Sequence, residues 1–186
     1  MARTAGSDKT ETHERIVRAA AKAIRRDGYA DTTVGSVMKE AGLTHGGFYA
    51  HFDSREAMLL EALDFAATES IANLVGAAHV RAVAEGISPL QAMVEHYLSD
   101  KHLRANDAGC TIVACGSETK RQSPEVRHVA TRHIQRLIAA IGAETPDALA
   151  KLSTMVGALL IAKIVDDPEL ADEVRAAARA AVLDQA

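Results

Sequence analysis

The stretch DTTVGSVMKEAGLTHGGFYAHFDSR, residues 31–55, decides the fold, because it carries the signals of two short helices joined by a tight turn. Thr33 is a residue type that caps helix N-termini, and apolar residues recur behind it at helical spacing. Gly42 supplies the turn, and Thr44 can cap a second helix. This arrangement predicts a helix-turn-helix motif.

The second of these helices carries the residues expected to read DNA. In a helix-turn-helix it enters the major groove with its N-terminal residues toward the base edges, so Thr44 and His45 are the candidates for base readout. Gly46 and Gly47 follow, and each costs about 1 kcal/mol against alanine in a helix interior. The pair either lets the backbone approach DNA closely or marks an irregular loop.

Aromatic residues alternate with polar ones at the end of the motif. Phe48 and Phe52 are spaced i, i+4, which predicts that both point into the core, and Leu43 with Phe48 fits a hydrophobic staple. Tyr49 and His51 then point elsewhere and can donate hydrogen bonds to phosphate oxygens, the contacts that set the register of a protein on DNA. Alternatively, Tyr49 is a half-buried packing residue.

The rest of the chain also reads as helical. Apolar residues at helical spacing between Ile16 and Ile24 predict a helix that ends at Gly28. Each proline follows a residue that caps helices, which predicts four helix starts, at Ser88-Pro89, Ser123-Pro124, Thr145-Pro146 and Asp167-Pro168. No segment alternates convincingly with period two. We therefore expect an all-α chain of about nine helices behind a disordered arm over residues 1–9.

Composition agrees with close-packed helices and narrows the class of protein. Of 186 residues, 48% are apolar and only 3% are aromatic, which disfavours a β-sandwich. The net charge of −4 excludes binding to nucleic acid by bulk charge. The longest apolar run falls well short of the roughly 20 residues that a membrane span needs, and the start MARTAGSDK lacks the apolar stretch of a secretory signal. We expect a soluble cytoplasmic protein with no membrane partner.

Residues 32–59, TTVGSVMKEAGLTHGGFYAHFDSREAML, resemble the DNA-binding signature of the TetR family of transcriptional repressors. The shared features are the turn glycine and the closely spaced Tyr, His and Phe before a capped long helix, here Gly42, Tyr49, His51, Phe52 and the cap Ser54. Arg55 stands where the family usually has lysine, and the resemblance gives it a phosphate-directed charge. Residues 109–127 more weakly resemble a stretch seen in many C-terminal domains of the family.

The resemblance implies a two-domain regulator. Residues 10–60 would form a three-helix DNA-binding domain with its motif at about 32–51, and residues 61–186 a helical domain for ligand binding and dimerisation. Its partners would be a palindromic double-stranded operator, a small-molecule effector and a second copy of the chain. The implied function is a one-component regulator, most often a repressor, that an effector releases from its operator.

Three sets of residues are the candidates for these roles. For DNA they are Thr33, Thr44, His45, Gly46, Gly47, Tyr49, His51 and Arg55. For the ligand they are the bulky or polar-tipped side chains Phe65, Met93, His96, Tyr97 and His133, since clefts between helices recruit such residues. For the dimer they are Leu152, Val156, Gly157, Leu160, Val174 and Ala178 on the last two helices, where small residues allow close packing.

Other chemistries find little support in the sequence. Cys110 and Cys115 lie five positions apart, about 140° around a helix, which suits buried structural thiols better than a disulfide. A redox-sensing regulator would need an exposed, low-pKa thiolate at one of them. The histidines lack the spacing of a zinc site, and no nucleophile elbow, Walker loop or dinucleotide fingerprint occurs, so we expect no metal, cofactor or enzymatic activity. A helical protein-interaction module without DNA binding remains the alternative from another class.

Overall fold

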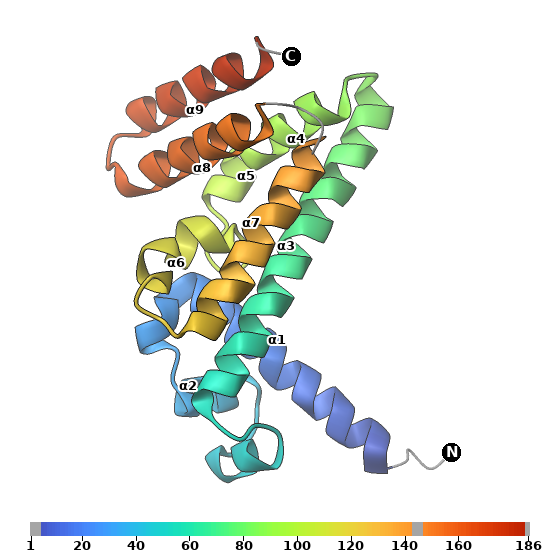
Figure 1. The fold of residues 1–186 in the computed structure, drawn as a ribbon, viewed down its shortest axis with the longest axis vertical. Coiled ribbons are helices and arrows are strands. Elements are labelled where there is room, and N and C mark those ends of the chain that lie inside the picture. Colours follow the sequence, from blue (N-terminus) through green and yellow to red (C-terminus); the bar gives the residue numbers. More distant parts are fainter. Residues whose placement is uncertain (1–4, 143–146, 185–186) are drawn as a thin grey trace.

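The computed structural model describes residues 5–142 and 147–184, which fold into helices joined by short connections (Figure 1). The elements are α1 Ala5–Asp31, α2 Val34–Glu40, the 3₁₀ helix η1 His45–Ala50, α3 Arg55–Glu85, α4 Pro89–Tyr97, α5 Asp100–Leu103, α6 Thr111–Thr119, α7 Pro124–Gly142, α8 Ala148–Ile164 and α9 Pro168–Leu183. The expected all-α class is confirmed, and no strand occurs in the described ranges.

Three of the expected helix starts are confirmed, two of them by their caps. The Ser88 hydroxyl accepts a hydrogen bond from the Gln91 N–H at 3.1 Å, and Asp167 accepts from Glu169 N at 2.9 Å. The helix after Ser123 begins at Pro124 as expected. The Thr145-Pro146 start lies outside the described residues.

The first helix differs from the expectation at both ends. Residues 5–9, expected within the disordered arm, form the first turns of α1, because adding residues to an existing helix costs little compared with starting one. Residues 1–4 lie outside the described ranges. Gly28 does interrupt the helix, with φ 80° and ψ −178°, but a further short helical stretch follows this kink to Asp31.

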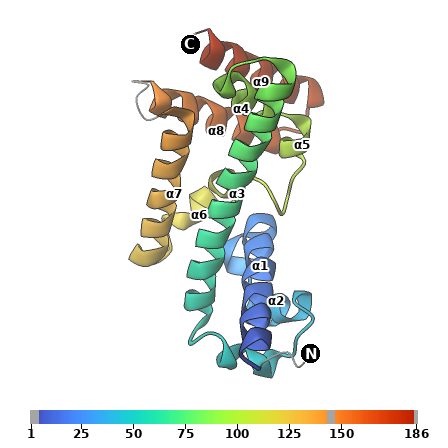
Figure 2. The same cartoon turned by 90° about the vertical axis from the view of Figure 1, so that its right-hand side faces the viewer.

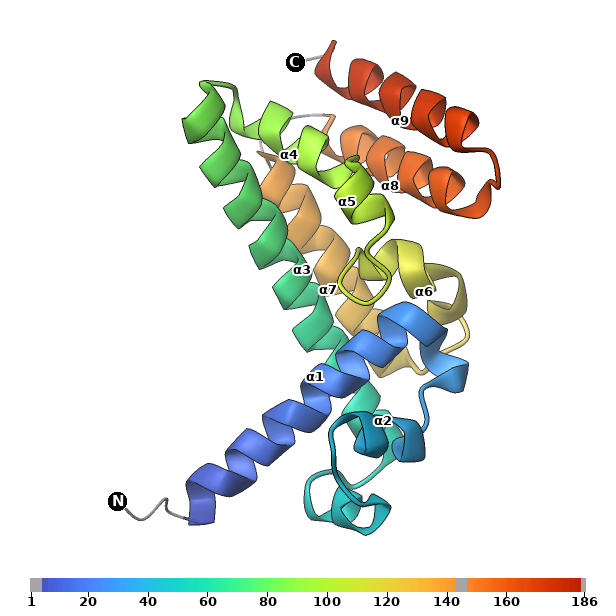
Figure 3. The ribbon, with the colours of Figure 1, turned by 180° about the vertical axis from the view of Figure 1, so that it is seen from behind.

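The molecule has two apolar cores that α3 connects. Met58 and Leu63 of α3 belong to the first core, with α1, α2 and η1, whereas Leu74 and Ala78 belong to the second, with α4, α7, α8 and α9. Figures 2 and 3 show α3 running from the end that holds α2 and η1 to the opposite end of the molecule. The long helix therefore links the predicted DNA-binding unit with the rest of the chain.

Helices α8 and α9 pack side by side at the end of the molecule farthest from α2 (Figure 1). The buried Arg175 of α9 donates from Nη1 to the Leu98 carbonyl at 3.0 Å and pairs with Asp100 at 2.6 Å, which ties α9 to the end of α4 and to α5. Among the described residues, no helix combines the length and apolarity that a membrane crossing requires.

Candidate nucleic-acid interface

The first helix of the motif begins at the predicted cap. The Thr33 Oγ1 accepts from the Ser36 N–H, and the Ser36 Oγ accepts from the Thr33 N–H, each at 3.1 Å. This reciprocal pair is a capping box, and it occupies the Thr33 hydroxyl within the protein. Gly42 has a φ of 69°, the left-handed conformation that the turn requires and that glycine adopts without strain.

The second helix of the motif is a 3₁₀ helix, His45–Ala50, rather than an α-helix. Thr44 lies at its N-cap position, but its side chain makes no capping hydrogen bond, so the predicted side-chain cap is wrong. The Gly47 N–H instead donates to the Thr44 carbonyl at 3.1 Å, the i→i+3 bond of a 3₁₀ turn. Consecutive glycines weaken the α-helical alternative, which is consistent with this shorter-range bonding.

Two phenylalanines anchor this element, as predicted. Phe48 is fully buried and Phe52 nearly so, and their rings stack at 5.5 Å between centroids. The His13 ring of α1 stacks on Phe52 at 4.5 Å, and Leu43 packs against the same core. The anchoring fixes which side of η1 faces solvent.

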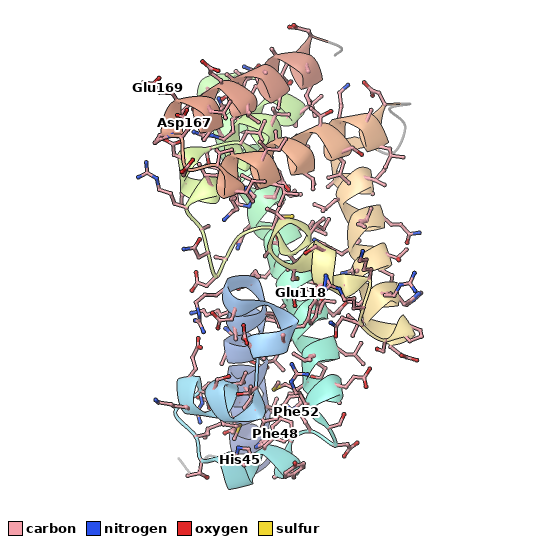
Figure 4. The ribbon with its side chains drawn as sticks, turned by 90° about the vertical axis from the view of Figure 1, so that its left-hand side faces the viewer. His45, Phe48, Phe52, Glu118, Asp167 and Glu169 are labelled. Carbon is pink, nitrogen blue, oxygen red and sulfur yellow. The ribbon has the colours of Figure 1, made fainter. Side chains whose placement is uncertain are left out.

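The outward side of η1 carries the candidate readers. Thr44, His45 and Gly46 are exposed, and Tyr49 is 70% exposed, so the half-buried packing alternative for Tyr49 is wrong. Figure 4 shows His45 at the extremity of the molecule, with Phe48 and Phe52 behind it. A Cβ added at Gly46 would meet no atom within 4 Å, so nothing in the fold itself requires glycine there.

His51 lies at the edge of this surface and is half-buried. Its Nδ1 is buried and makes no hydrogen bond to any described residue. Burial first, and then the nearby charges of His13 and Lys9, lower the pKa of His51. The ring is therefore neutral at neutral pH, which leaves it able to donate one hydrogen bond.

Arg55 is exposed, but two of its three guanidinium nitrogens are engaged within the protein. Its Nε donates to the Thr32 carbonyl at 2.9 Å, and its Nη2 donates to the Tyr29 carbonyl. The planar guanidinium can satisfy both carbonyls at once, which a lysine ammonium cannot do with the same geometry. Arg55 thus ties the start of α3 to the α1–α2 connection, and its predicted phosphate contact stays a prediction.

A contact that the sequence did not predict joins this unit to the rest of the chain. Glu118 of α6 accepts from the Tyr29 N–H at 3.0 Å, and the Thr119 hydroxyl lies 3.4 Å from the Tyr29 hydroxyl. A Cβ at Gly28 would lie 2.3 Å from Glu118 Oε1, so the carboxylate can reach Tyr29 only beside a glycine. Figure 4 places Glu118 at the junction of α6 with α1. The only sequence signal near Glu118 was the weak resemblance over residues 109–127.

The five ligand candidates do not come together in one site. Phe65 lines a groove of about 1150 Å³ among α1, α3 and α7, whereas His133 lines a separate cavity of about 280 Å³. Met93 and Tyr97 are buried in the second core, and His96 stacks on His102 at 6.4 Å. They lie apart because α4 packs against the far half of α3 and against α9, away from the His133 cavity.

The dimer candidates divide by exposure. Leu152 and Ala178 are buried in the chain's own second core, so they do not reach the surface in this structure. Val156, Gly157 and Val174 are half-buried, and Leu160 is exposed. The sequence did not single out Leu149, Ile161 and Ile164, which α8 also exposes.

Neither cysteine lies at the surface of this fold. Both are free and buried, as expected for structural thiols. The Cys115 thiol donates to the Thr111 carbonyl at 3.0 Å, and burial is the main cause that raises its pKa to about 12. A redox sensor needs an exposed thiolate, whereas both of these thiols are buried. Within the described ranges no group of three or more His, Cys, Asp or Glu could hold a metal ion.

Comparisons with known proteins agree with this architecture. The family described as "Bacterial regulatory proteins, tetR family" matches residues 16–62. An uncharacterized HTH-type transcriptional regulator of Mycobacterium tuberculosis is 30% identical over 171 residues, which cover 83% of this chain and 85% of that protein. The regulator YerO of Bacillus subtilis, also uncharacterized, is 38% identical over 55 residues, 30% of this chain but only 19% of YerO.

Solved structures extend the likeness to the whole fold. A TetR-family regulator from Cytophaga hutchinsonii superposes with a TM-score of 0.75 at 19% identity and covers 96% of each chain. A TetR regulator from Chloroflexus aurantiacus gives a TM-score of 0.74 at 22% identity, over 95% of this chain and 96% of that one.

The motif, its exposed face and the helical body behind it define a helix-turn-helix DNA-binding transcription regulator. Together with the match over 171 residues, they show that the chain belongs to the TetR family of bacterial regulatory proteins.

Proposed function

We propose that the protein is a dimeric, one-component repressor that binds a palindromic operator in the cytoplasm and leaves it when a small molecule binds. The observation that carries this proposal is the outward face of η1, where polar and small residues are exposed around Tyr49 while Phe48 and Phe52 hold the element from behind. An element that buries its two phenylalanines and exposes polar and small residues suits docking into a groove.

The DNA contacts follow from that face. Thr44 and His45 lie at the start of η1 and are assigned to base edges, because the N-terminal end of the recognition helix meets them. Tyr49 and His51 are assigned to phosphate oxygens. Gly46 and Gly47 are assigned to close backbone approach, and Thr33 and Arg55 to positioning, since their polar groups are engaged within the protein.

The dimer surface is assigned to the exposed apolar residues of α8. Leu160 and Ile164 are spaced i, i+4, and with the half-buried Val156 and Gly157 they form one stripe. A second copy related by a twofold axis would cover this stripe with its own. The pairing would place two η1 elements at one end of the dimer, as a palindrome requires.

Release by a ligand is supported by how the two cores are joined. Two recognition elements must lie about 34–36 Å apart to enter successive major grooves on one face of DNA. Each DNA-binding unit is held to the body by α3 and by the Glu118–Tyr29 bond, so a ligand that shifts α6 or α3 would change that separation. Linkage then requires tighter ligand binding to the DNA-free form, typically by about 5- to 150-fold.

Operator selection from random duplexes tests the proposal, followed by fluorescence anisotropy of the selected duplex at several salt concentrations. We expect a palindromic sequence and affinity that falls steeply with salt, because phosphate neutralisation releases counterions. Tyr49→Phe and His51→Ala should each weaken binding by about 10-fold, the value of one charged hydrogen bond. His79→Ala, at an exposed position on α3, is the matched control.

Retention of full affinity by both variants would refute the phosphate assignment. Failure to select any duplex would favour a helical protein-interaction module instead.

A further inference from the structure

The cavity that His133 lines lies where α3, α6, α7 and α8 meet, and it has a volume of about 280 Å³. Aliphatic side chains form most of its wall, among them Leu63, Ile112, Ile134 and Val156, with Ser and Thr hydroxyls and the Cys115 thiol. Among the described residues that line it, none is Asp, Glu, Lys or Arg. The cavity therefore offers no partner for a charged ligand, whose desolvation would go uncompensated.

His133 differs from the rest of this wall in its unused hydrogen-bonding groups. It is 2% exposed, and neither of its ring nitrogens has a hydrogen-bond partner among the described residues. Burial, followed by the charge of Arg136, lowers its pKa to about 4 against an opposing effect of Asp64. A neutral imidazole presents one donor and one acceptor, and leaving both unused in a buried place is costly.

The larger groove that Phe65 lines does not share this feature. Six of its ionic side chains are paired with one another: Arg18 with Glu14 at 3.2 Å, Arg132 with Asp64 at 3.1 Å, and His13 with Glu61 at 2.7 Å. A ligand there would compete with bonds that the protein already makes. Among the described residues that line the two spaces, the buried polar atoms without a hydrogen-bond partner are those of His133 in the smaller cavity.

We infer that this cavity binds an uncharged, mainly apolar molecule of about the size of a bicyclic aromatic ring, held by one hydroxyl or carbonyl group that hydrogen-bonds to His133. The size follows from the volume, which is just below the range of drug-sized sites. The polarity follows from the wall, which combines aliphatic surface with a single buried imidazole. The role of this cavity as an effector site rests on the function proposed above, whereas the chemistry inferred for its ligand does not.

The position of the cavity suits an effector. Residues from Thr111 to Thr119 of α6 contribute much of its wall, and Glu118, between two of these wall residues, holds the Tyr29 N–H of the DNA-binding unit. Helix α6 contacts α1 as well as α7 and α8 (Figure 1). A molecule that presses on one side of α6 therefore acts directly on the element that holds α1.

Four probes that share one ring system test the ligand class on the full-length protein without DNA. Naphthalene is the bare ring system, and 2-naphthol carries one hydroxyl group on it. The other two probes carry a charge, 2-naphthoate an anionic carboxylate and 2-naphthylmethylammonium a cationic ammonium group. By calorimetric titration we expect 2-naphthol to saturate the protein with a Kd below about 1 mM. Naphthalene should bind about 2- to 10-fold more weakly, the loss of one neutral hydrogen bond, and the two ions should bind at least about 100-fold more weakly.

Variants assign the binding to His133. His133→Phe keeps an aromatic ring in the wall but removes both nitrogens, so naphthol and naphthalene should bind it equally. His128→Phe, at an exposed position on the same helix, should retain the preference for naphthol. Nitrogen chemical shifts of the His133 ring in the unmodified protein give a second readout, which should change with naphthol and not with naphthalene.

The inference is overturned if naphthol fails to bind at millimolar concentration, if either ion binds as tightly as naphthol, or if naphthol binding leaves the His133 nitrogens unchanged. Operator release is measured separately, by adding naphthol to the protein–DNA complex. Binding through His133 without release would leave the ligand site standing and refute its role as an effector site. A protein that binds naphthol but no duplex would refute the proposed function alone.

Discussion

Gly28 is the residue on which the attachment of the DNA-binding unit to α6 depends. Its φ of 80° with ψ of −178° lies in a region that is essentially restricted to glycine. Its missing side chain also leaves the space that Glu118 uses to reach the Tyr29 N–H. One glycine thus allows both the kink of α1 and the contact across the two cores.

Gly28→Ala should destabilise the protein by about 2–3 kcal/mol, because it combines backbone strain with displacement of the Glu118 carboxylate. Gly42→Ala, whose Cβ would meet nothing within 4 Å, should cost only the conformational strain of about 1 kcal/mol. Urea unfolding measures both. The double variant Gly28→Ala with Glu118→Ala should lose less free energy of unfolding than the two single variants lose together, because both changes break the same contact. Additive losses would contradict the coupling.

His133 predicts a dependence of stability on pH. Its folded pKa of about 4 lies below the ordinary value of about 6.5, so the unfolded chain binds more protons between these two values. The contribution of His133 to the free energy of unfolding should therefore be fully present above about pH 6.5. It should be lost, by about 3 kcal/mol, as the pH drops toward 4, with no further loss from this group below that pH. In urea unfolding at several pH values, the free energy of unfolding should change less steeply with pH for His133→Phe than for wild type or for His128→Phe. Equal slopes in all three proteins would contradict it.

At the scale of elements, the sequence predicted what local chemistry determines. The Thr33 cap, the Gly42 turn and the inward Phe48 and Phe52 pair follow from short-range rules, and the structure confirms them. The 3₁₀ form of η1 was not predictable in the same way, because Gly46 and Gly47 weaken an α-helix without specifying what replaces it.

Gly46→Ala separates folding from DNA contact at η1. Because a Cβ there meets no atom of the protein, the free energy of unfolding should hardly change. If the backbone at Gly46 approaches DNA closely, the added methyl group should reduce operator affinity by about 10-fold or more, equivalent to about 1.4 kcal/mol. Gly76→Ala on α3, also open to solvent, is the control and should leave operator affinity unchanged. Unchanged affinity for Gly46→Ala in an anisotropy titration would contradict close approach.

At the scale of the whole molecule, long-range contacts decide what the sequence could not show. The bonds that Arg55 and Glu118 make to the backbone of Tyr29 join residues 26 and 89 positions apart, and no local pattern encodes such pairs. The ligand candidates lie apart for the same reason, since the packing of α4 against α9 separates Met93 and Tyr97 from His133. Residue type suggested which side chains suit a site, but only the tertiary fold decides which of them meet.

The apolar stripe on α8 is expected to hold two subunits together. Leu160 is 43% and Ile164 is 72% exposed, so replacing both by glutamate should leave the subunit fold intact, with unchanged helical circular dichroism. In a twofold dimer each glutamate would meet apolar surface or its own symmetry copy, and the buried charge would be uncompensated. Sedimentation velocity should therefore find a monomer at concentrations where the unmodified protein is a dimer.

The same double variant should bind the operator about 100-fold or more weakly, because one subunit engages one half-site without the gain of a linked second contact. Glutamates at Val80 and Val83, which are 69% and 73% exposed on α3, add the same charge away from α8 and should alter neither the assembly nor the affinity. A dimer that survives Leu160→Glu with Ile164→Glu would move the interface off α8. A monomer that keeps full operator affinity would instead show that each recognition element binds DNA alone. A palindromic operator would then no longer follow from the twofold symmetry of a dimer.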